Sequence, residues 1–370
     1  MKSLKDFLNF MKNKLFISGG VLSGKSTIIY LFDGHQDFLV NAIHLQLIKS
    51  FKNLIDNLEE NNDKKEHGEK IFFTLSYRNK LYPVIEQDFE KILFHTNIEH
   101  LKKYSIEKTY PNFTSALKPT YLDFQFDYFN FIEMFKYDLK NDQNPLKLRD
   151  LIEKFYYNFF LNWKDKKFIE SKNQFNEKYV VSKLPNDIQS IEFALSEIPN
   201  SKIIYVDRDL MGIMKSRVLN FMMKRSLNLE DFDKYFLALS KSDFFKKINL
   251  QKKQIYSLRK NNLNRIFITS LESLVYDTDN EMKKISNFLE IKFDQILTKV
   301  TYLSNEINNS HTFEINDDKY QVSEKSEFFA NLMSSNWIYL RKVRKYFFIK
   351  YLKEVLISIY LNIKFLFIKG

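Results

Sequence analysis

One stretch near the N-terminus, Gly19 to Ser26, has residue types and a spacing suited to holding phosphate. It fits the pattern G-x-x-x-x-G-K-[ST], with an apolar run, Lys14 to Ser18, before it and a helical run after it. Small residues let backbone N–H groups approach phosphate oxygens, and a helix start directs its positive end towards them. The chain is therefore predicted to bind a phosphorylated nucleotide.

A second constellation follows the apolar run Ile203–Val206. Asp207 at its end is the kind of residue that holds Mg²⁺ in phosphoryl-transfer enzymes. The next residue is Arg208, and Ser216 lies eight positions later, inside a predicted helix. A strand-end guanidinium and a hydroxyl about two turns further on can converge on one phosphate. This pair favours a ligand with a phosphate that a kinase does not need to recognise.

The composition excludes some chemistry and favours an anionic partner. The 370 residues contain no Cys, which rules out disulfides, thiolate metal sites and a Cys nucleophile. The net charge of +11 suits a polyphosphorylated cofactor or an acidic surface. Nearly all of the excess is scattered Lys, and zinc spacing, an aromatic RNA-binding signature and a concentrated basic arm are missing, so nucleic-acid binding is not expected.

The elements that must position these residues alternate between strands and helices at both ends of a long helical middle. This order predicts the α/β class: a P-loop-like parallel sheet flanked by helices, with a large helical insertion and a C-terminal helical tail. The aromatic-rich pieces 121–137 and 151–163 are expected to be core rather than a binding groove. Strands are predicted at 14–18, 38–41, 179–182, 203–206 and 266–270, and helices at 25–33, 186–197, 211–223, 226–262 and 279–289.

Three separated stretches resemble the sulfotransferases that use 3′-phosphoadenosine 5′-phosphosulfate, of the bacterial, carbohydrate or tyrosylprotein type. FISGGVLSGKSTIIYLFDGHQDFLV is similar to the family's 5′-phosphosulfate loop, helix and D-G-H-P-like turn. YVVSKLPNDIQSIEFALSEIPNSKIIYVDRDLMGIMKSR is similar to its K-T-P segment, helix and 3′-phosphate motif. ITSLESLVYDTDNEMKKISNFLEIKFD is similar to its Y-E-D-L turn and the helix that follows. The order and rough spacing of these stretches also match the family.

The resemblance implies a role for each candidate residue. Lys25 would stabilise the charge that builds on the leaving phosphate, while Arg208 and Ser216 would grip the 3′-phosphate. Residues near 305–310 would lie over the adenosine. The resemblance implies no metal. The implied 5′-phosphosulfate ligands are Gly20, Ser23, Gly24, Lys25, Ser26 and Thr27.

The sequence departs from the family pattern at two positions. Leu22 stands where many members carry Lys or Arg, and Lys25 is expected to supply that charge from the other side of the loop. His44 stands where many relatives have a Glu, and we predict it as the base for the acceptor hydroxyl, because a neutral imidazole takes up protons near neutral pH. A buried core histidine is the alternative.

Other polar residues in these stretches have different expected roles. His35 is expected to cap the turn after the first helix rather than to act as the base. Lys183 is a candidate for contact with the donor or the acceptor. Glu272 is expected to cap a helix or brace the sheet, and Arg217 to face solvent.

The sequence thus predicts transfer of a sulfuryl group to a hydroxyl of an acceptor, with a carbohydrate or glycolipid favoured. The alternatives are a P-loop kinase or NTPase using Mg·ATP and a non-enzymatic peripheral membrane protein. The latter would use the basic, apolar tail 336–370. The predicted catalytic domain spans 1–335, with residues 45–178 closing over the acceptor. Without a signal peptide or an apolar run long enough to span a bilayer, a cytoplasmic location is expected.

Overall fold

The computed structural model describes residues 13–20, 23–41, 46–61, 70–96, 125–164, 178–185, 187–240 and 244–302, with positions 98, 101–102, 305–306, 322–323, 326 and 330. Its contacts define two compact units, each described here by itself. The first comprises Met1–Gly19, Ser23–Asp207 and Leu258–Phe313, and the second Gly20–Leu22, Arg208–Ser257 and Glu314–Gly370. The predicted tail 336–370 lies outside the described residues, and the predicted domain limits stay a prediction.

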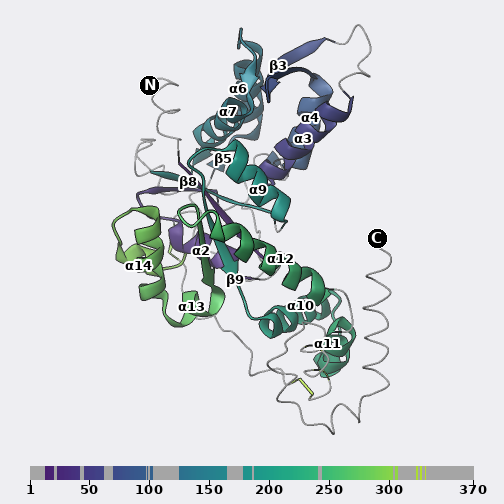
Figure 1. The fold of residues 1–370 in the computed structure, drawn as a ribbon, viewed down its shortest axis with the longest axis vertical. Coiled ribbons are helices and arrows are strands. Elements are labelled where there is room, and N and C mark those ends of the chain that lie inside the picture. Colours follow the sequence, from purple (N-terminus) through teal and green to yellow (C-terminus); the bar gives the residue numbers. More distant parts are fainter. Residues whose placement is uncertain are drawn as a thin grey trace. The chain divides into compact units, whose positions relative to one another are not determined.

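The first unit contains a five-stranded sheet in the order β10-β9-β1-β8-β2, with every neighbouring pair parallel (Figure 1). All six residues of β1 are buried, as expected of a strand covered on both faces. The predicted parallel sheet is therefore confirmed. Its strands are β1 (Lys14–Gly19), β2 (Phe38–Val40), β8 (Tyr179–Lys183), β9 (Lys202–Asp207) and β10 (Ile266–Ser270).

The pairing register brings the carboxyl ends of four strands to one edge of the sheet. Gly19 of β1 pairs with Val206 of β9, and Ile17 pairs with Lys183 at the end of β8. Asp207 pairs with Ser270 of β10. In open parallel sheets, ligands bind outside this edge where the strand order reverses. Here β1 fills that position, because β8 and β9 flank it on opposite sides.

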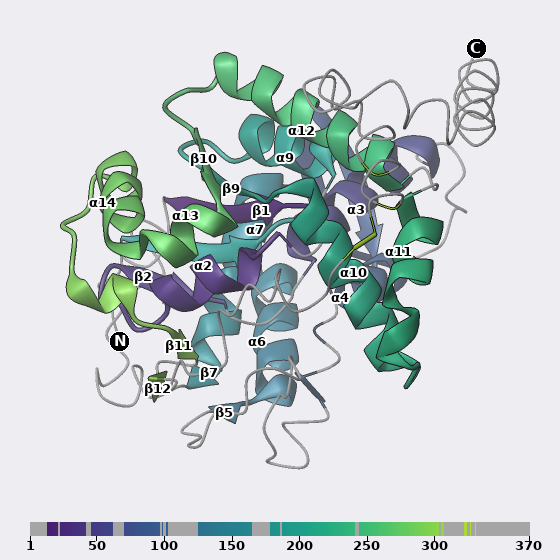
Figure 2. The same cartoon turned by 90° about the horizontal axis from the view of Figure 1, so that it is seen from below.

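Helices flank the sheet, and two of them have polar side chains as N-caps. α2 (Lys25–Phe32) packs on β1, β8 and β2 (Figure 2). The carboxylate of Asp187 caps α9 (Ile188–Glu197), and the hydroxyl of Ser270 caps α13 (Leu271–Tyr276). α14 (Thr278–Leu289) follows and precedes the short elements η2 (Gln295–Thr298), β11 (Thr301–Tyr302) and β12 (Asn305–Glu306).

In the described part of the segment predicted as a helical insertion, helices predominate, but one part that was predicted to be helical forms strands. Residues Ile71–Tyr77 and Lys80–Ile85 form an antiparallel hairpin, β3 and β4. Arg78 and Asn79 form its two-residue turn with φ of 47° and 63°, the conformation that favours such hairpins. The helices are α3 (Leu47–Asn61), α4 (Glu86–His95), α6 (Tyr128–Lys140) and α7 (Leu148–Leu161), and the short strands are β5 (Gln125–Phe126), β6 (Leu146–Lys147) and β7 (Trp163–Lys164).

Many aromatic side chains of α6 and α7 form a core, as predicted, whereas Phe129 and Tyr137 of α6 are exposed. Phe131 and Phe135 of α6 and Phe155 of α7 are fully buried and pack edge-to-face. Phe159 continues the stack towards Trp163, which is 1% exposed. Aromatic pairs in these orientations add stability beyond their buried area. These residues therefore hold the insertion together and are not free to bind a ligand.

The described part of the second unit is helical. α10 (Leu210–Lys224), η1 (Leu229–Asp231) and α11 (Phe232–Ser240) precede α12 (Phe244–Lys260), whose last turn belongs to the first unit. A core cluster joins α10 and α11 through Met214, Val218, Met222, Phe232, Phe236 and Ala330. In the described ranges, no helix is long and apolar enough to cross a membrane.

Candidate active site

The loop that follows β1 begins at a position where only glycine fits. Gly19 has φ of 152°, and a Cβ there would lie 2.4 Å from the Val206 carbonyl oxygen. It would also lie 2.4 Å from Ser23 Oγ. Because Val206 is backbone in the adjacent strand, it cannot move aside. The absent side chain lets the loop turn tightly against β9.

The loop ends at a second constrained glycine, which starts α2. Gly24 is the N-cap of α2 with φ of 90°, and a Cβ there would lie 2.5 Å from Leu271 of α13. No side chain caps the helix and no acidic residue lies in its first turn. The positive end of α2 is therefore not compensated by a side chain of the helix itself, as expected of an anion site.

Ser23 carries a buried hydroxyl that has no hydrogen-bond partner within the described structure. The residue is 1% exposed, and its Oγ lies on the inner side of the loop next to Gly19. A buried polar atom without a partner costs about 1–3 kcal/mol, so such an atom requires an explanation. A bound oxyanion at the start of α2 would accept the hydrogen bond that this hydroxyl can donate.

Two lysines from different elements reach the same loop. Lys25 Nζ donates to the Gly19 carbonyl at 3.1 Å, and Lys183 Nζ at the end of β8 donates to Ser26 Oγ at 3.2 Å. Burial, and secondarily the charge of Lys183, lowers the pKa of Lys25 to about 7. Burial alone lowers the pKa of Lys183 to about 8. The structure therefore brings together two predicted candidates that are far apart in sequence.

The remaining predicted loop residues differ in how the fold constrains them. The Thr27 N–H donates to the Gly24 carbonyl at 2.9 Å, closing the first turn of α2. A Cβ on Gly20, which is described with the second unit, would make only an ordinary van der Waals contact, 3.9 Å from Ile213 Cδ1. Gly20 is thus not required by packing, in contrast to Gly19.

In the second unit, the predicted pair Arg208 and Ser216 is already in contact. Arg208 directly follows β9 and is 8% exposed, and its Nη1 donates to Ser216 Oγ at 2.8 Å. Asp209 caps α10 through Gly212 N, which places Ser216 two turns into the helix. Lys252 of α12 donates to the Arg208 carbonyl at 2.6 Å. The guanidinium is therefore held at the start of α10 with its charge retained.

Gly212 is a site residue that the sequence reasoning missed. A Cβ there would lie 3.0 Å from Arg208 Nε, so the missing side chain makes room for the guanidinium. Glycine inside a helix costs about 0.5–1 kcal/mol relative to alanine. A glycine three residues after the N-cap Asp209 was the available signal, because a helix has no need of it.

Other predicted residues fall outside this group or outside the description. His44 lies outside the described residues, and of the stretch 305–310 only 305–306 is described. His35 is buried and its Nδ1 accepts from Asp37 N at 3.1 Å, as predicted for a turn cap. Arg217 is exposed, with its guanidinium over the Phe244 ring. Glu272 lies in the first turn of α13, whose N-cap is Ser270.

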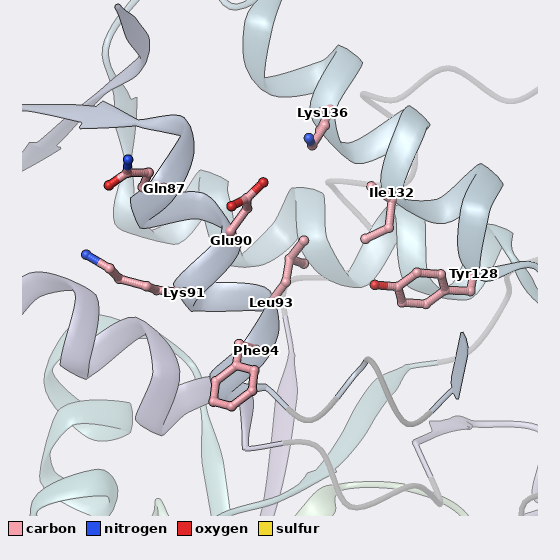
Figure 3. Close-up of a pocket in the computed structure, with 8 residues that line it drawn as sticks. All are labelled: Gln87, Glu90, Lys91, Leu93, Phe94, Tyr128, Ile132 and Lys136. Carbon is pink, nitrogen blue, oxygen red and sulfur yellow. The ribbon is translucent and has the colours of Figure 1, made fainter. Parts of the chain in front are cut away.

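A groove lies between α4 and α6 in the first unit, with a volume of about 570 Å³. Figure 3 shows Leu93 and Phe94 of α4 across from Tyr128 and Ile132 of α6. This size is within the range of small-molecule sites. Thr96, directly after α4, accepts a hydrogen bond from Gln46 N, just before α3. The other lining residues are Gln87, Glu90, Lys91 and Lys136.

The parallel sheet and the glycine-bounded loop at its edge beside β1 place the first unit in the α/β class, with the layout of a phosphate-binding fold. The chain belongs to the sulfotransferase family, whose sequence model matches residues 80–295, and it is a sulfotransferase enzyme. The match includes Lys183, Arg208 and Ser216, but it begins after the loop at Gly19–Thr27 and does not include it.

Solved structures similar to the chain include other sulfotransferases. The sulfotransferase domain from the curacin biosynthetic pathway is 15% identical with a TM-score of 0.44, covering 88% of this chain and 98% of that one. The sulfotransferase domain of the Synechococcus PCC 7002 olefin synthase is 13% identical with a TM-score of 0.43, covering 88% and 95%. Retinol dehydratase, in complex with androsterone and the inactive cofactor PAP, is 14% identical with a TM-score of 0.34, covering 90% and 84%. No curated protein sequence matches the chain significantly.

Proposed function

We propose that this sulfotransferase takes the sulfuryl group from 3′-phosphoadenosine 5′-phosphosulfate and transfers it to a hydroxyl of its acceptor. The observation that carries the proposal is the loop after β1, where the buried Ser23 hydroxyl has no partner beside an uncapped helix start. When bound, the donor supplies an activated sulfuryl group and a phosphate leaving group.

The 5′-phosphosulfate fits the residues of the loop. The start of α2 offers backbone N–H groups, while Ser23 and Ser26 offer hydroxyls. Lys25 and Lys183 provide cations on two sides of the loop, and a cation near the bridging oxygen stabilises the charge that develops there during transfer. These groups replace the basic residue that the resemblance expects at the position of Leu22.

The 3′-phosphate fits the preformed pair after β9. A guanidinium presents a planar fork that matches phosphate oxygens, and the Ser216 hydroxyl already lies 2.8 Å from it. The 3′-phosphate is the group that distinguishes this donor from ATP. A pair built for it therefore separates sulfuryl transfer from phosphoryl transfer.

For the acceptor we propose a carbohydrate or a glycolipid, as the sequence reasoning favoured. Aromatic and polar side chains share the lining of the groove between α4 and α6, a mixture suited to a molecule with both polar and apolar faces. Glycosylated and non-glycosylated alcohols should be compared as acceptors with labelled donor. Exclusive sulfation of non-carbohydrate alcohols would overturn this part of the proposal.

The acceptor base is proposed to be His44. Its replacement by Ala should leave cofactor affinity unchanged but lower turnover by ~10²–10⁴-fold, the usual contribution of general base catalysis. Steady-state kinetics with parallel calorimetry of the bisphosphate product measures both. His35→Asn is a matched control, since His35 is engaged in a turn. Unchanged turnover in His44→Ala would place the base elsewhere.

The function is tested by thermal shift with adenosine 3′,5′-bisphosphate and with Mg·ATP. Stabilisation by the bisphosphate without added metal supports the proposal, while stabilisation by Mg·ATP alone contradicts it and favours phosphoryl transfer.

We also propose a cytoplasmic enzyme that contacts membranes through residues 336–370. Unchanged liposome binding after removal of 346–370 would contradict that contact.

A further inference from the structure

The two lysines at the loop form a pair of cations without a carboxylate between them. Lys25 rises from the first turn of α2 and Lys183 from the end of β8, on the strand adjacent to β1. Their ammonium groups donate only to neutral oxygens in the described contacts, Gly19 O and Ser26 Oγ. Both residues are half-buried. Burying two like charges together is costly unless an anion joins them.

Carboxylates do lie on the elements around this pair. Asp207 ends β9, Glu272 lies in the first turn of α13 and Asp187 caps α9 through Ser190 N. The charged influence on Lys25 is the positive charge of Lys183, which lowers its pKa, and the pKa of Lys183 responds to burial. The neighbouring acids therefore do not hold the pair in its charged state.

We propose that Lys25 and Lys183 act as one charge-switching pair, which binds the anionic 5′ end of the cofactor together with a proton. This inference rests on the proposed function, since it requires that end of the cofactor to occupy the loop. In the ligand-free enzyme near pH 8, Lys25 is mostly neutral and Lys183 is about half charged. An anion between them favours the charged form of both.

Besides supplying positive charge, the pair discriminates between ligands by the charge of the group that enters the loop. A ligand end with two negative charges compensates both ammonium groups, whereas a monoanion compensates only one and leaves the other buried and unpaired. The loop therefore favours fully ionised phosphate or phosphosulfate over singly charged groups. A neutral ligand end leaves both lysines neutral and gains nothing from them.

Linkage fixes the sign of the pH dependence. Protons are taken up on binding, so affinity for the bisphosphate is greatest near pH 7 and falls as the pH rises through the free-enzyme pKa values of about 7 and 8. Uptake of one proton corresponds to a ~10-fold loss of affinity per pH unit. Below about pH 6 the ligand's own phosphates begin to protonate, which limits the useful range to higher pH.

The test is isothermal titration calorimetry of the full chain with adenosine 3′,5′-bisphosphate at pH 8, in buffers of different ionisation enthalpy. The slope of observed enthalpy against buffer enthalpy gives the protons taken up. The wild type should take up roughly one to one and a half protons, most of one on Lys25 and about half of one on Lys183. Lys25→Met should leave only the part of the uptake that Lys183 accounts for. Lys183→Met should lower the uptake by removing that part and by relieving the positive charge that lowers the pKa of Lys25. Lys80→Met, which changes an exposed lysine at the start of β4, should not change it.

The outcomes separate the two proposals. If the bisphosphate binds without proton uptake in the wild type, the charge-switching pair is overturned while the proposed function stands. If uptake in both lysine variants equals that of the wild type, the protons go to another group and the inference is again overturned. If the bisphosphate does not bind the wild type at all, the proposed function fails. The wild-type result decides the question even where a variant does not fold.

Discussion

The loop after β1 and the segment after β9 both offer cations to phosphate, but they do so in different ways. Arg208 keeps its charge when buried, and Gly212 and Ser216 form a fitted place for its guanidinium. Lys25 and Lys183 lose much of their charge when buried beside each other. A buried arginine is therefore a permanent anion receptor, whereas a buried lysine pair binds anions only when it also takes up protons.

The largest expected effect is on the stability of the fold, and it differs between the two glycines of the loop. Gly19→Ala should destabilise the fold by about 3–5 kcal/mol, because its Cβ collides with the Val206 carbonyl and its φ of 152° disfavours a side chain. Gly20→Ala, where the nearest atom lies 3.9 Å away, should change stability by less than about 1 kcal/mol. Thermal or urea unfolding measures both. Equal destabilisation would show that the loop turns differently.

Removing the arginine should weaken binding by an amount that depends on the ligand. Arg208→Ala should cost ~2–3 kcal/mol of affinity for adenosine 3′,5′-bisphosphate, the scale of a lost charge-assisted contact. It should cost almost nothing for adenosine 5′-monophosphate, which lacks the 3′-phosphate. Calorimetry with both nucleotides provides its own control. An equal loss for the two ligands would mean that Arg208 supports the fold rather than the 3′-phosphate.

The pH dependence of stability tests whether Lys25 and Lys183 lose charge when the chain folds. The lowered pKa values of Lys25 and Lys183 mean that the unfolded chain binds more protons than the folded one between about pH 7 and 10. Stability should therefore rise with pH over this window. Above it, Tyr77 and Tyr179, whose pKa values burial raises to about 12, act in the opposite direction.

Melting temperatures of the ligand-free enzyme at pH 7 and pH 9.5 check this expectation. Lys183→Met should flatten the rise, whereas Lys80→Met, at an exposed position, should leave it intact. A wild-type stability that falls across this window, with no difference between the variants, would show that the lysines stay charged in the folded enzyme.

The smallest expected effect concerns the helical hydroxyl. Ser216→Ala removes one neutral contact to the Arg208 guanidinium and should weaken bisphosphate binding by about 1 kcal/mol, or ~5-fold. Ser226→Ala, beyond the end of α10, is a control on the same unit. A loss as large as that of Arg208→Ala would mean that Ser216 carries the phosphate contact and the arginine only positions it.

Much of the fold could be predicted because burial leaves a strong local pattern. Continuous apolar runs such as Ile203–Val206 mark strands that are covered on both faces, and the observed β9 spans Lys202–Asp207. The hairpin at 71–85 was missed because its alternation of buried and exposed residues lay inside a segment read with helical spacing. The Arg78-Asn79 turn was its available signal.

The site could be predicted where it is local and not where it depends on tertiary contact. The Gly19–Thr27 loop and the Arg208–Ser216 pair each lie within a short stretch, so their spacing alone identifies them as candidates. Lys183 meets Ser26 only through the pairing of β8 with β1, at a sequence separation of 157 residues. Gly212 acquires its meaning only from the position of the Arg208 side chain.

Recognition of two phosphates on one adenosine underlies the proposed function, and one measurement tests it most directly. Calorimetry of the wild-type enzyme at pH 7, without added metal, should give at least ~10-fold tighter binding of adenosine 3′,5′-bisphosphate than of adenosine 5′-monophosphate, since one charge-assisted phosphate contact contributes ~1.5–3 kcal/mol. Equal affinities, or binding of neither nucleotide, would contradict the account.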